Sequence, residues 1–145
     1  YGGAWRKTIR VLQSYKRRSM TIEALTAECK EIQAFLEEPY DNEVAVMSAR
    51  LTQVNVYLAR TAEILSLSKQ LQDKAVKAAF AAHMDAIMGM TPSISKIFVN
   101  SYTDEENRLV TWADRLNAAL VHQGDNMRTQ ISLEKQMLDL SRKGY

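Results

Sequence analysis

The stretch MGMTPS, residues 88–93, separates the two longest helical patterns in this chain of 145 residues. Gly89 belongs to the residue type that most often follows the last turn of a helix, Thr91 is a favoured N-cap, and Pro92 suits the first helical position. The stretch therefore predicts that one helix ends here and another begins. So short a connection favours two long helices that pair side by side and antiparallel.

The segment before this turn predicts one long helix over residues 43–88, because nothing in it interrupts helical periodicity. This helix would carry two apolar stripes. The first comprises Met47, Leu51, Val54, Leu58, Ala62 and Leu65, and the second comprises Val46, Val56, Tyr57, Ile64, Leu67 and Leu71. An apolar face of this width is too large for a single neighbouring helix.

The segment after the turn predicts helix over residues 92–140. Thr103-Asp104-Glu105-Glu106 fits the capping-box pattern, so we expect a bend near residues 101–103, although one continuous helix also fits. The residues expected to face the core are Leu109, Ala113, Leu116, Leu120, Met127, Ile131 and Leu138.

The first 43 residues divide sharply by charge. Residues 1–20 contain six basic residues and no acidic one, and their apolar positions predict a basic amphipathic helix. Residues 21–38 predict a second, acidic helix that Thr21 caps and Pro39 ends. Between residues 21 and 43 there are seven acidic residues and only one basic residue, so the two segments have opposite charges of equal size.

The composition favours an all-α fold in one domain over residues 1–145, because five glycines and two prolines are few and good helix formers are plentiful. We expect an elongated helical bundle with two long antiparallel helices and a shorter amino-terminal helical pair. The single cysteine allows no disulfide within the chain. No apolar run approaches the ~20 residues that span a bilayer, so we expect no membrane partner and a cytoplasmic location.

A helix over residues 43–88 would be about 68 Å long, far longer than a compact globule of this size allows. Either it breaks near Ser66 and Ser68, or it projects and buries its second stripe against another copy. We expect the second, since exposed apolar stripes mark association surfaces. The sequence thus predicts a homo-oligomer. The expected interface residues are Met47, Leu51, Val54, Leu58, Leu65, Leu116, Leu120, Gly124, Met127 and Ile131.

Catalytic chemistry has little support in the sequence. His83 lies near Asp85 and His122 near Asp125, but one histidine with one carboxylate does not make a metal site. No phosphate-binding loop, nucleophile elbow or zinc motif occurs. We therefore expect no enzyme activity, no metal and no cofactor, and we expect His83 to be a partly buried helix residue.

Residues 1–18 are the strongest candidate for a binding surface. Cationic side chains interspersed with aromatic ones suit single-stranded nucleic acid, because cations contact phosphates and aromatic rings stack on bases. The predicted nucleic-acid-binding residues are Trp5, Arg6, Lys7, Arg10, Tyr15, Lys16, Arg17 and Arg18. Two alternatives stay open: pairing of these charges with the acidic segment, and binding to an anionic membrane surface.

The stretch VHQGDNMRTQISLEKQ, residues 121–136, places many hydrogen-bonding residues and one glycine inside a predicted helix. Gly124 costs about 1 kcal/mol relative to alanine, which suggests a local bend or the close approach of another backbone. A half-buried polar seam that fixes helix register between subunits is one interpretation. A solvated helix face that tolerates its glycine is the other.

The layout of a long apolar helix, the Gly89-Met90-Thr91-Pro92 turn, the Thr103-Asp104-Glu105-Glu106 restart and a second long helix resembles the UvsY-type recombination mediators of phages. The resemblance covers about residues 43–140 and is one of helical organisation. It implies a ring-like homo-oligomer that binds single-stranded DNA, contacts a single-strand-binding protein and helps to load a recombinase. No functional residue is carried over by it.

Two functional hypotheses follow. The first is a non-catalytic, phage-type accessory protein of DNA recombination that binds single-stranded DNA as a homo-oligomer. The second is a structural helical subunit of a virion or other large assembly, in which the basic and acidic segments of neighbouring copies make charge-complementary contacts.

Overall fold

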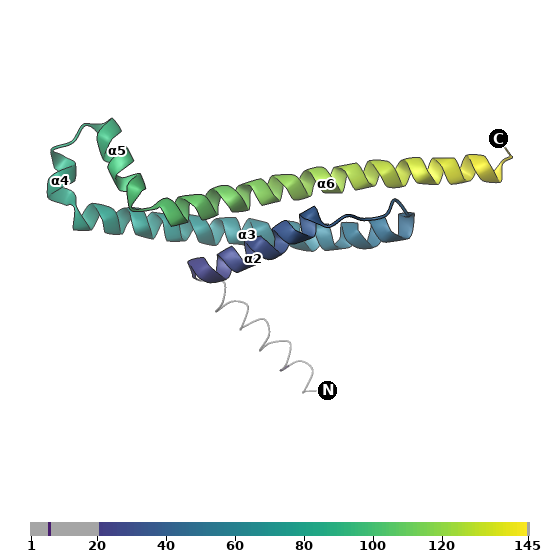
Figure 1. Ribbon diagram of the computed structural model, residues 1–145, viewed down its shortest axis with the longest axis horizontal. Coiled ribbons are helices and arrows are strands. Elements are labelled where there is room, and N and C mark those ends of the chain that lie inside the picture. The colour runs from purple at the N-terminus through teal and green to yellow at the C-terminus, as the bar shows by residue number, and fades with distance from the viewer. Residues whose placement is uncertain (1–5, 7–20, 145) are drawn as a thin grey trace.

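The computed structural model describes Arg6 and residues 21–144. Every regular element in this part of the chain is helical and none is a strand, which confirms the all-α prediction. The helices are α2 (Ile22–Glu37), α3 (Val44–Ala82), α4 (Met84–Met88), α5 (Pro92–Ser101) and α6 (Asp104–Arg142). Figure 1 shows an elongated arrangement in which α3 and α6 lie along one another, α2 lies beside them, and α4 and α5 form the tip of one end.

The direction of α3 relative to α6 follows from the hydrogen bonds between them. Three side-chain pairs join the helices, Gln72 with Asn107, Thr61 with Asn117, and Arg50 with Gln123. The residue number falls along α3 as it rises along α6, so the two helices run antiparallel. Each has 39 residues, which corresponds to a length of about 58 Å.

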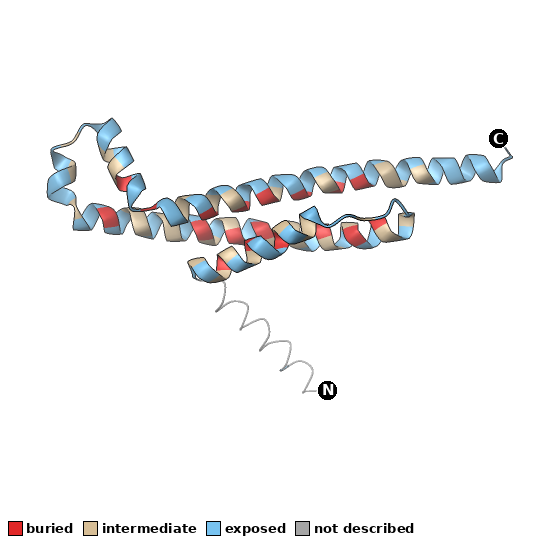
Figure 2. Ribbon diagram, in the orientation of Figure 1, coloured by how far each residue is buried: buried red, intermediate tan, exposed pale blue. Residues whose placement is uncertain are grey.

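The core lies where α2, α3 and α6 face one another. Helix α2 contributes Leu25, Cys29 and Ile32, whose i, i+4, i+7 spacing places them on one face of the helix. The other buried members of the core cluster are Val54, Ile64, Leu109, Ala113, Leu116, Leu120 and Met127. Figure 2 shows these buried positions concentrated in the middle of the molecule, whereas both of its ends are largely exposed.

The predicted helix over residues 43–88 is wrong at its carboxyl end. Helix α3 ends at Ala82, His83 leaves helical geometry at φ −127° and ψ 25°, and the short helix α4 follows. The His83 ring stacks on Tyr102 with centroids 4.5 Å apart and meets the edge of Phe98 at 5.5 Å. Helix α3 therefore ends next to an aromatic cluster, in which His83 contacts Phe98 of α5 and Tyr102, the residue that follows α5.

Side-chain caps mark two of the helix starts. Thr21 accepts a hydrogen bond from the backbone N–H of Ala24, and Thr91 accepts one from that of Ile94. Helix α5 ends at Ser101 and α6 begins at Asp104, so the chain leaves helical geometry where a bend was expected, but the capping-box prediction is wrong. Thr103 is fully buried, makes no side-chain cap bond and accepts instead from Nδ2 of Asn107 at 3.0 Å.

Candidate functional site

The predicted nucleic-acid-binding residues are almost all outside the described part of the chain. Arg6 is the exception, and it is helical and exposed. Trp5, Lys7, Arg10, Tyr15, Lys16, Arg17 and Arg18 are the ones that lie outside. Residues 21–144 hold thirteen basic and seventeen acidic residues, which gives them a net charge of −4. Binding to phosphates therefore stays a prediction tied to residues 1–20.

The residues predicted to join separate copies have partners within one chain. Met47, Val54, Leu116, Leu120, Gly124 and Met127 are buried, and Leu51, Leu58, Leu65 and Ile131 are half-buried. The second stripe of α3 is partly covered as well, because Ile64 is buried and the Tyr57 ring meets the ring of Phe35 on α2 at 4.9 Å. Six of the ten predicted interface residues are therefore covered within one chain, and the other four are only partly exposed.

The polar stretch of α6 contacts α2 and α3 of the same chain. Nε of Arg50 donates to Oε1 of Gln123 at 3.1 Å, and Nη2 of Arg50 donates to the carbonyl oxygen of Phe35 at 2.6 Å. The guanidinium carbon lies 4.1 Å from the ring centroid of Phe35 and 4.6 Å from that of Tyr40. This Arg50 cluster ties the end of α2 to both long helices, so it serves the fold.

Gly124 faces α3, but not in the way the sequence suggested. A Cβ atom added to it would have side-chain atoms as its three nearest neighbours, with Nη1 of Arg128 and Cγ1 of Val54 at 3.5 Å and Cδ1 of Leu51 at 3.7 Å. These are ordinary van der Waals distances, and α6 continues unbroken through this point. The expectation of a bend or a close backbone approach is therefore wrong.

Part of the acidic segment pairs with a cation of α3. Nη2 of Arg60 lies 2.6 Å from Oε2 of Glu28, and both side chains are at most one-fifth exposed. Glu28 precedes Cys29, which is completely buried. Burial raises the pKa of the Cys29 thiol to about 11, with the nearby charge of Glu28 as a second cause. The thiol is thus protonated at neutral pH, which is unsuitable for a nucleophile.

A groove of about 420 Å³ runs between α2 and α6. Its walls are formed by Ile22, Glu23, Thr26, Ala27, Lys30, Glu105, Arg108, Leu109 and Trp112. Nε1 of Trp112 donates to Oε1 of Gln33 at 3.3 Å. The groove mixes two carboxylates with two cations, and it contains no histidine or cysteine. Within the described residues, no group of three or more histidine, cysteine, aspartate or glutamate side chains is placed to hold a metal ion.

Most of the large apolar side chains that are exposed to solvent lie at the two ends of the molecule. Twelve large apolar side chains of the described chain are exposed. Six lie at or next to the tip, namely Phe80 in the last turn of α3, Met84 and Met88 in α4, Ile94 and Ile97 in α5, and Tyr102 directly after α5. Four belong to the last turns of α6, namely Leu133, Met137, Leu138 and Leu140. Only Val56 and Val121 lie between these groups.

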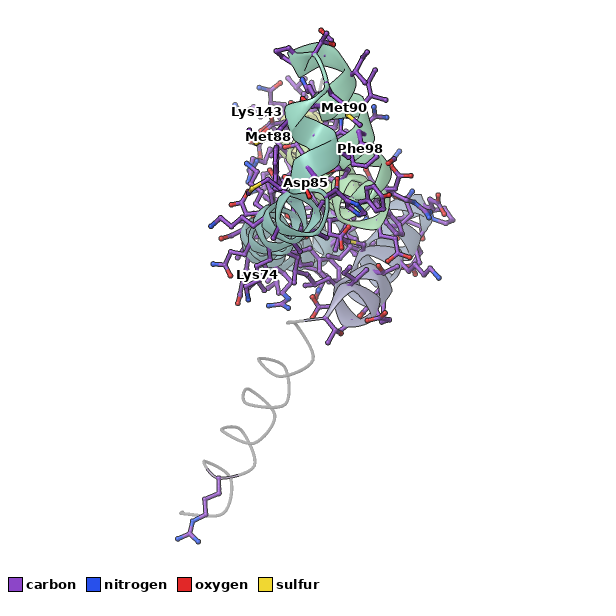
Figure 3. All side chains as sticks on the ribbon, turned by 90° about the vertical axis from the view of Figure 1, so that its left-hand side faces the viewer. Lys74, Asp85, Met88, Met90, Phe98 and Lys143 are labelled. Atoms are coloured by element: carbon purple, nitrogen blue, oxygen red, sulfur yellow. The ribbon has the colours of Figure 1, made fainter. Side chains whose placement is uncertain are left out.

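Figure 3 views the molecule from its tip, where the labelled Met88 and Asp85 come from α4 and Phe98 comes from α5. The side chains of Met88 and Ile97 are among the most exposed, at 81% and 71%. Methionine adapts its shape to an irregular apolar partner. The tip therefore has the chemistry of an association surface.

Within the described residues, no helix is both long enough and apolar enough to cross a membrane. No protein-family model matches the chain, and neither the curated proteins nor the solved structures contain a significant match.

Proposed function

We propose that this chain is a non-catalytic, helical assembly subunit whose copies associate through the two apolar ends of the α3–α6 rod. The distribution of exposed apolar side chains supports this proposal most strongly. Ten of the twelve lie at the ends, at residues 80–102 and 133–140, and two lie on the shaft between them. Apolar side chains gathered at opposite ends of a rod suit contacts that extend an assembly along its axis.

The interior of the rod supports the same proposal. Three hydrogen-bonded pairs and a continuous apolar core hold α3 against α6. Polar pairs inside a helix seam fix its register and orientation. A shaft of fixed register would hold the two ends at a constant separation, as a packing element requires.

Sedimentation of the chain over a wide range of concentrations tests self-association. We expect oligomers that dissociate on dilution, and we expect the double substitution M88K/I97K at the tip to weaken them at least about tenfold. Both side chains are exposed, so thermal unfolding should change little. The double substitution V56K/V121K, which places the same two charges on the shaft, is the matched control. A wild-type chain that stays monomeric at every concentration would contradict the proposal.

We propose a second candidate function, the binding of single-stranded DNA along residues 1–20, as in an accessory protein of DNA recombination. Charge favours it, because the first twenty residues carry all of the positive excess while residues 21–144 carry a net −4. Phosphate contacts of this kind release counterions, so affinity should fall steeply as salt rises. Oligomers would multiply the contact through avidity. A single-strand-binding protein and a recombinase are the partners to examine.

The triple substitution K16E/R17E/R18E tests the second candidate. Under the second, it abolishes binding of a labelled poly-dT strand but leaves sedimentation unchanged. If the basic segment instead pairs with acidic residues of neighbouring copies, the same change weakens assembly. Absent or salt-insensitive binding by the wild-type chain would remove the second candidate and leave the first in place.

A further inference from the structure

Within the described chain, the two arginines that flank Trp112 have no carboxylate partner. Arg108 and Arg115 lie at i−4 and i+3 from Trp112, so the three side chains share one face of α6. Both arginines are exposed. No described carboxylate lies within 4.0 Å of either guanidinium, which is the range in which partners are found for Arg50, Arg60 and Arg128. Two uncompensated positive charges therefore stand beside an aromatic ring.

The Trp112 ring is held in one orientation at the edge of two hollows. Its Nε1 donates to Oε1 of Gln33 on α2 at 3.3 Å, and the guanidinium carbon of Arg108 lies 5.9 Å from the ring centroid. Trp112 and Arg108 line both the groove between α2 and α6 and a second, more open hollow of about 430 Å³. Since Trp112 is half-buried, part of its ring stays accessible. A fixed and accessible indole is suited to stacking on a planar ligand.

The second hollow contains no acidic side chain. Its two cations and two neutral polar side chains surround the tryptophan, and its walls are formed by Asn107, Arg108, Thr111, Trp112 and Arg115. A further cation, Lys30, lines the groove from α2. The net charge of −4 over residues 21–144 thus hides a local excess of positive charge around Trp112.

The nearest carboxylates are kept to one end of this region. Glu23 lies in the first turn of α2, and the first turn of α6 holds Asp104, Glu105 and Glu106. The next acid along α6, Asp114, lies about 160° around the helix from Trp112. An anionic ligand would therefore be attracted to Trp112 and repelled from the starts of the two helices.

A single nucleic-acid strand needs cations for its phosphates and aromatic rings for its bases. Arg108 and Arg115 are separated by about 10.5 Å along the helix, so they reach different phosphates. We propose that Trp112 stacks on a base of single-stranded DNA while these two arginines contact phosphates on either side of that base. The site rests on the second candidate function and adds to it a contact within the described helices. Residues 1–20 join α2 directly before Ile22, in the wall of the groove, so one strand can contact both regions.

Fluorescence reports the stacking directly. The chain has two tryptophans, Trp5 and Trp112, so Trp5→Phe makes the signal of Trp112 observable alone and keeps an aromatic ring at position 5. A dT oligonucleotide should quench this signal, and the quenching should saturate together with the anisotropy of a labelled strand. An abasic oligonucleotide of equal length offers phosphates without bases. It should leave the fluorescence of Trp112 nearly unchanged.

Neutral substitution of the two arginines tests the phosphate contacts. R108Q/R115Q removes two contacts to a single strand, which should reduce the slope of log affinity against log salt by about 1.4. Affinity for the dT strand at low salt should fall at least about fivefold. K74Q/K77Q, which removes two charges from exposed positions of α3, is the matched control and should change the slope much less.

Substitution of Trp112 separates stacking from packing. W112A should weaken binding of the dT strand about tenfold, because it removes the stacking of one base. W112F keeps a ring and should keep most of the affinity. Both variants lose the hydrogen bond to Gln33, so thermal unfolding of each is measured alongside. Equal affinities for W112A and W112F would assign the ring to the fold and overturn the site.

The outcomes separate this site from the proposed function. Binding by the wild-type chain without a change in Trp112 fluorescence would overturn the site and keep the second candidate. Equal salt slopes for R108Q/R115Q and K74Q/K77Q would do the same. A wild-type chain that binds no strand would overturn both. Quenching that needs bases, together with a shallower salt slope for R108Q/R115Q, is the result expected.

Discussion

Arg50 on α3 donates through Nε to the amide oxygen of Gln123 on α6, 3.1 Å away and 73 residues later in the chain. Gln123 in turn donates through Nε2 to the carbonyl oxygen of Leu36 at 3.4 Å. Together the two side chains connect all three helices of the core. Since the Arg50 side chain is only 7% exposed, its charge depends on these partners for solvation.

Replacing Arg50 should therefore destabilise the fold. In Arg50→Met the hydrogen bonds to Phe35 and Gln123 and the contact with the Tyr40 ring are lost, while much of the apolar stem is kept. We expect the free energy of unfolding to fall by about 2–4 kcal/mol, measured by urea denaturation. Arg115→Met, an exposed position on α6, is the control and should stay close to wild type. Equal midpoints for the two variants would show that the Arg50 cluster contributes no net stability.

Gly124→Ala should stabilise the protein. The added Cβ would lie 3.5 Å or more from its neighbours, which is an ordinary contact distance. Alanine loses less backbone freedom than glycine in a helix, so the gain should be up to about 1 kcal/mol. Gly124→Leu is the matched contrast, because a longer side chain must displace Val54 or Leu51 and should cost about 1–3 kcal/mol. A destabilised alanine variant would show that the seam is tighter than these distances indicate.

The buried Cys29 thiol should make the free energy of unfolding fall as the pH rises into the alkaline range. Its pKa is raised from 9.0 to about 11 in the folded chain, chiefly by burial and secondarily by Glu28. The folded state thus keeps a proton that the unfolded state releases. This contribution is complete below about pH 9 and is lost as pH rises from 9 towards 11. Cys29→Ala removes it, so the variant should show a shallower loss of stability across that window, as followed by thermal unfolding. Parallel curves for the two proteins would contradict the shift.

Local signals in the sequence were sufficient for much of the helical architecture. Thr21 and Thr91 cap the helices that they were expected to start, and Pro92 is the first residue of α5. Six of the seven expected core residues of α6 are buried or half-buried. Caps and periodic apolar stripes act within a few residues, so one sequence is enough to detect them.

The features that the sequence did not predict depend on contacts between residues that are far apart in the chain. The end of α3 coincides with the stacking of His83 on Tyr102, and no glycine or proline marks it. The wide apolar face of α3 predicted a second neighbour, but periodicity cannot distinguish α2 of the same chain from another copy. Leu138 has the helical phase of the core-facing stripe, yet it is exposed. Helical phase shows which face of α6 a residue occupies, but it does not show where the partner helix begins.

The polar stretch around Gly124 illustrates the same limit in the candidate site. Its sequence indicated a hydrogen-bonded seam, and Gln123 does bond to Arg50, but within one chain. The sequence places Leu138 in the core and assigns no role to the other exposed side chains of the tip and of the last α6 turns. Their apolar character was visible in the sequence, whereas their lack of a partner becomes evident only once the helices are placed in space.

Helix α6 continues without interruption from the foot of the tip, at Asp104, to the far end of the rod. If neighbouring copies bind at the tip and at the last turns of α6, a pulling force between them would be carried along the backbone of this single helix. Helix α3 would bear little of that tension and would act as a brace that keeps α6 from bending. Mechanical strength along the axis would then be set by the longitudinal hydrogen bonds of one helix, and stiffness against buckling by the helix beside it.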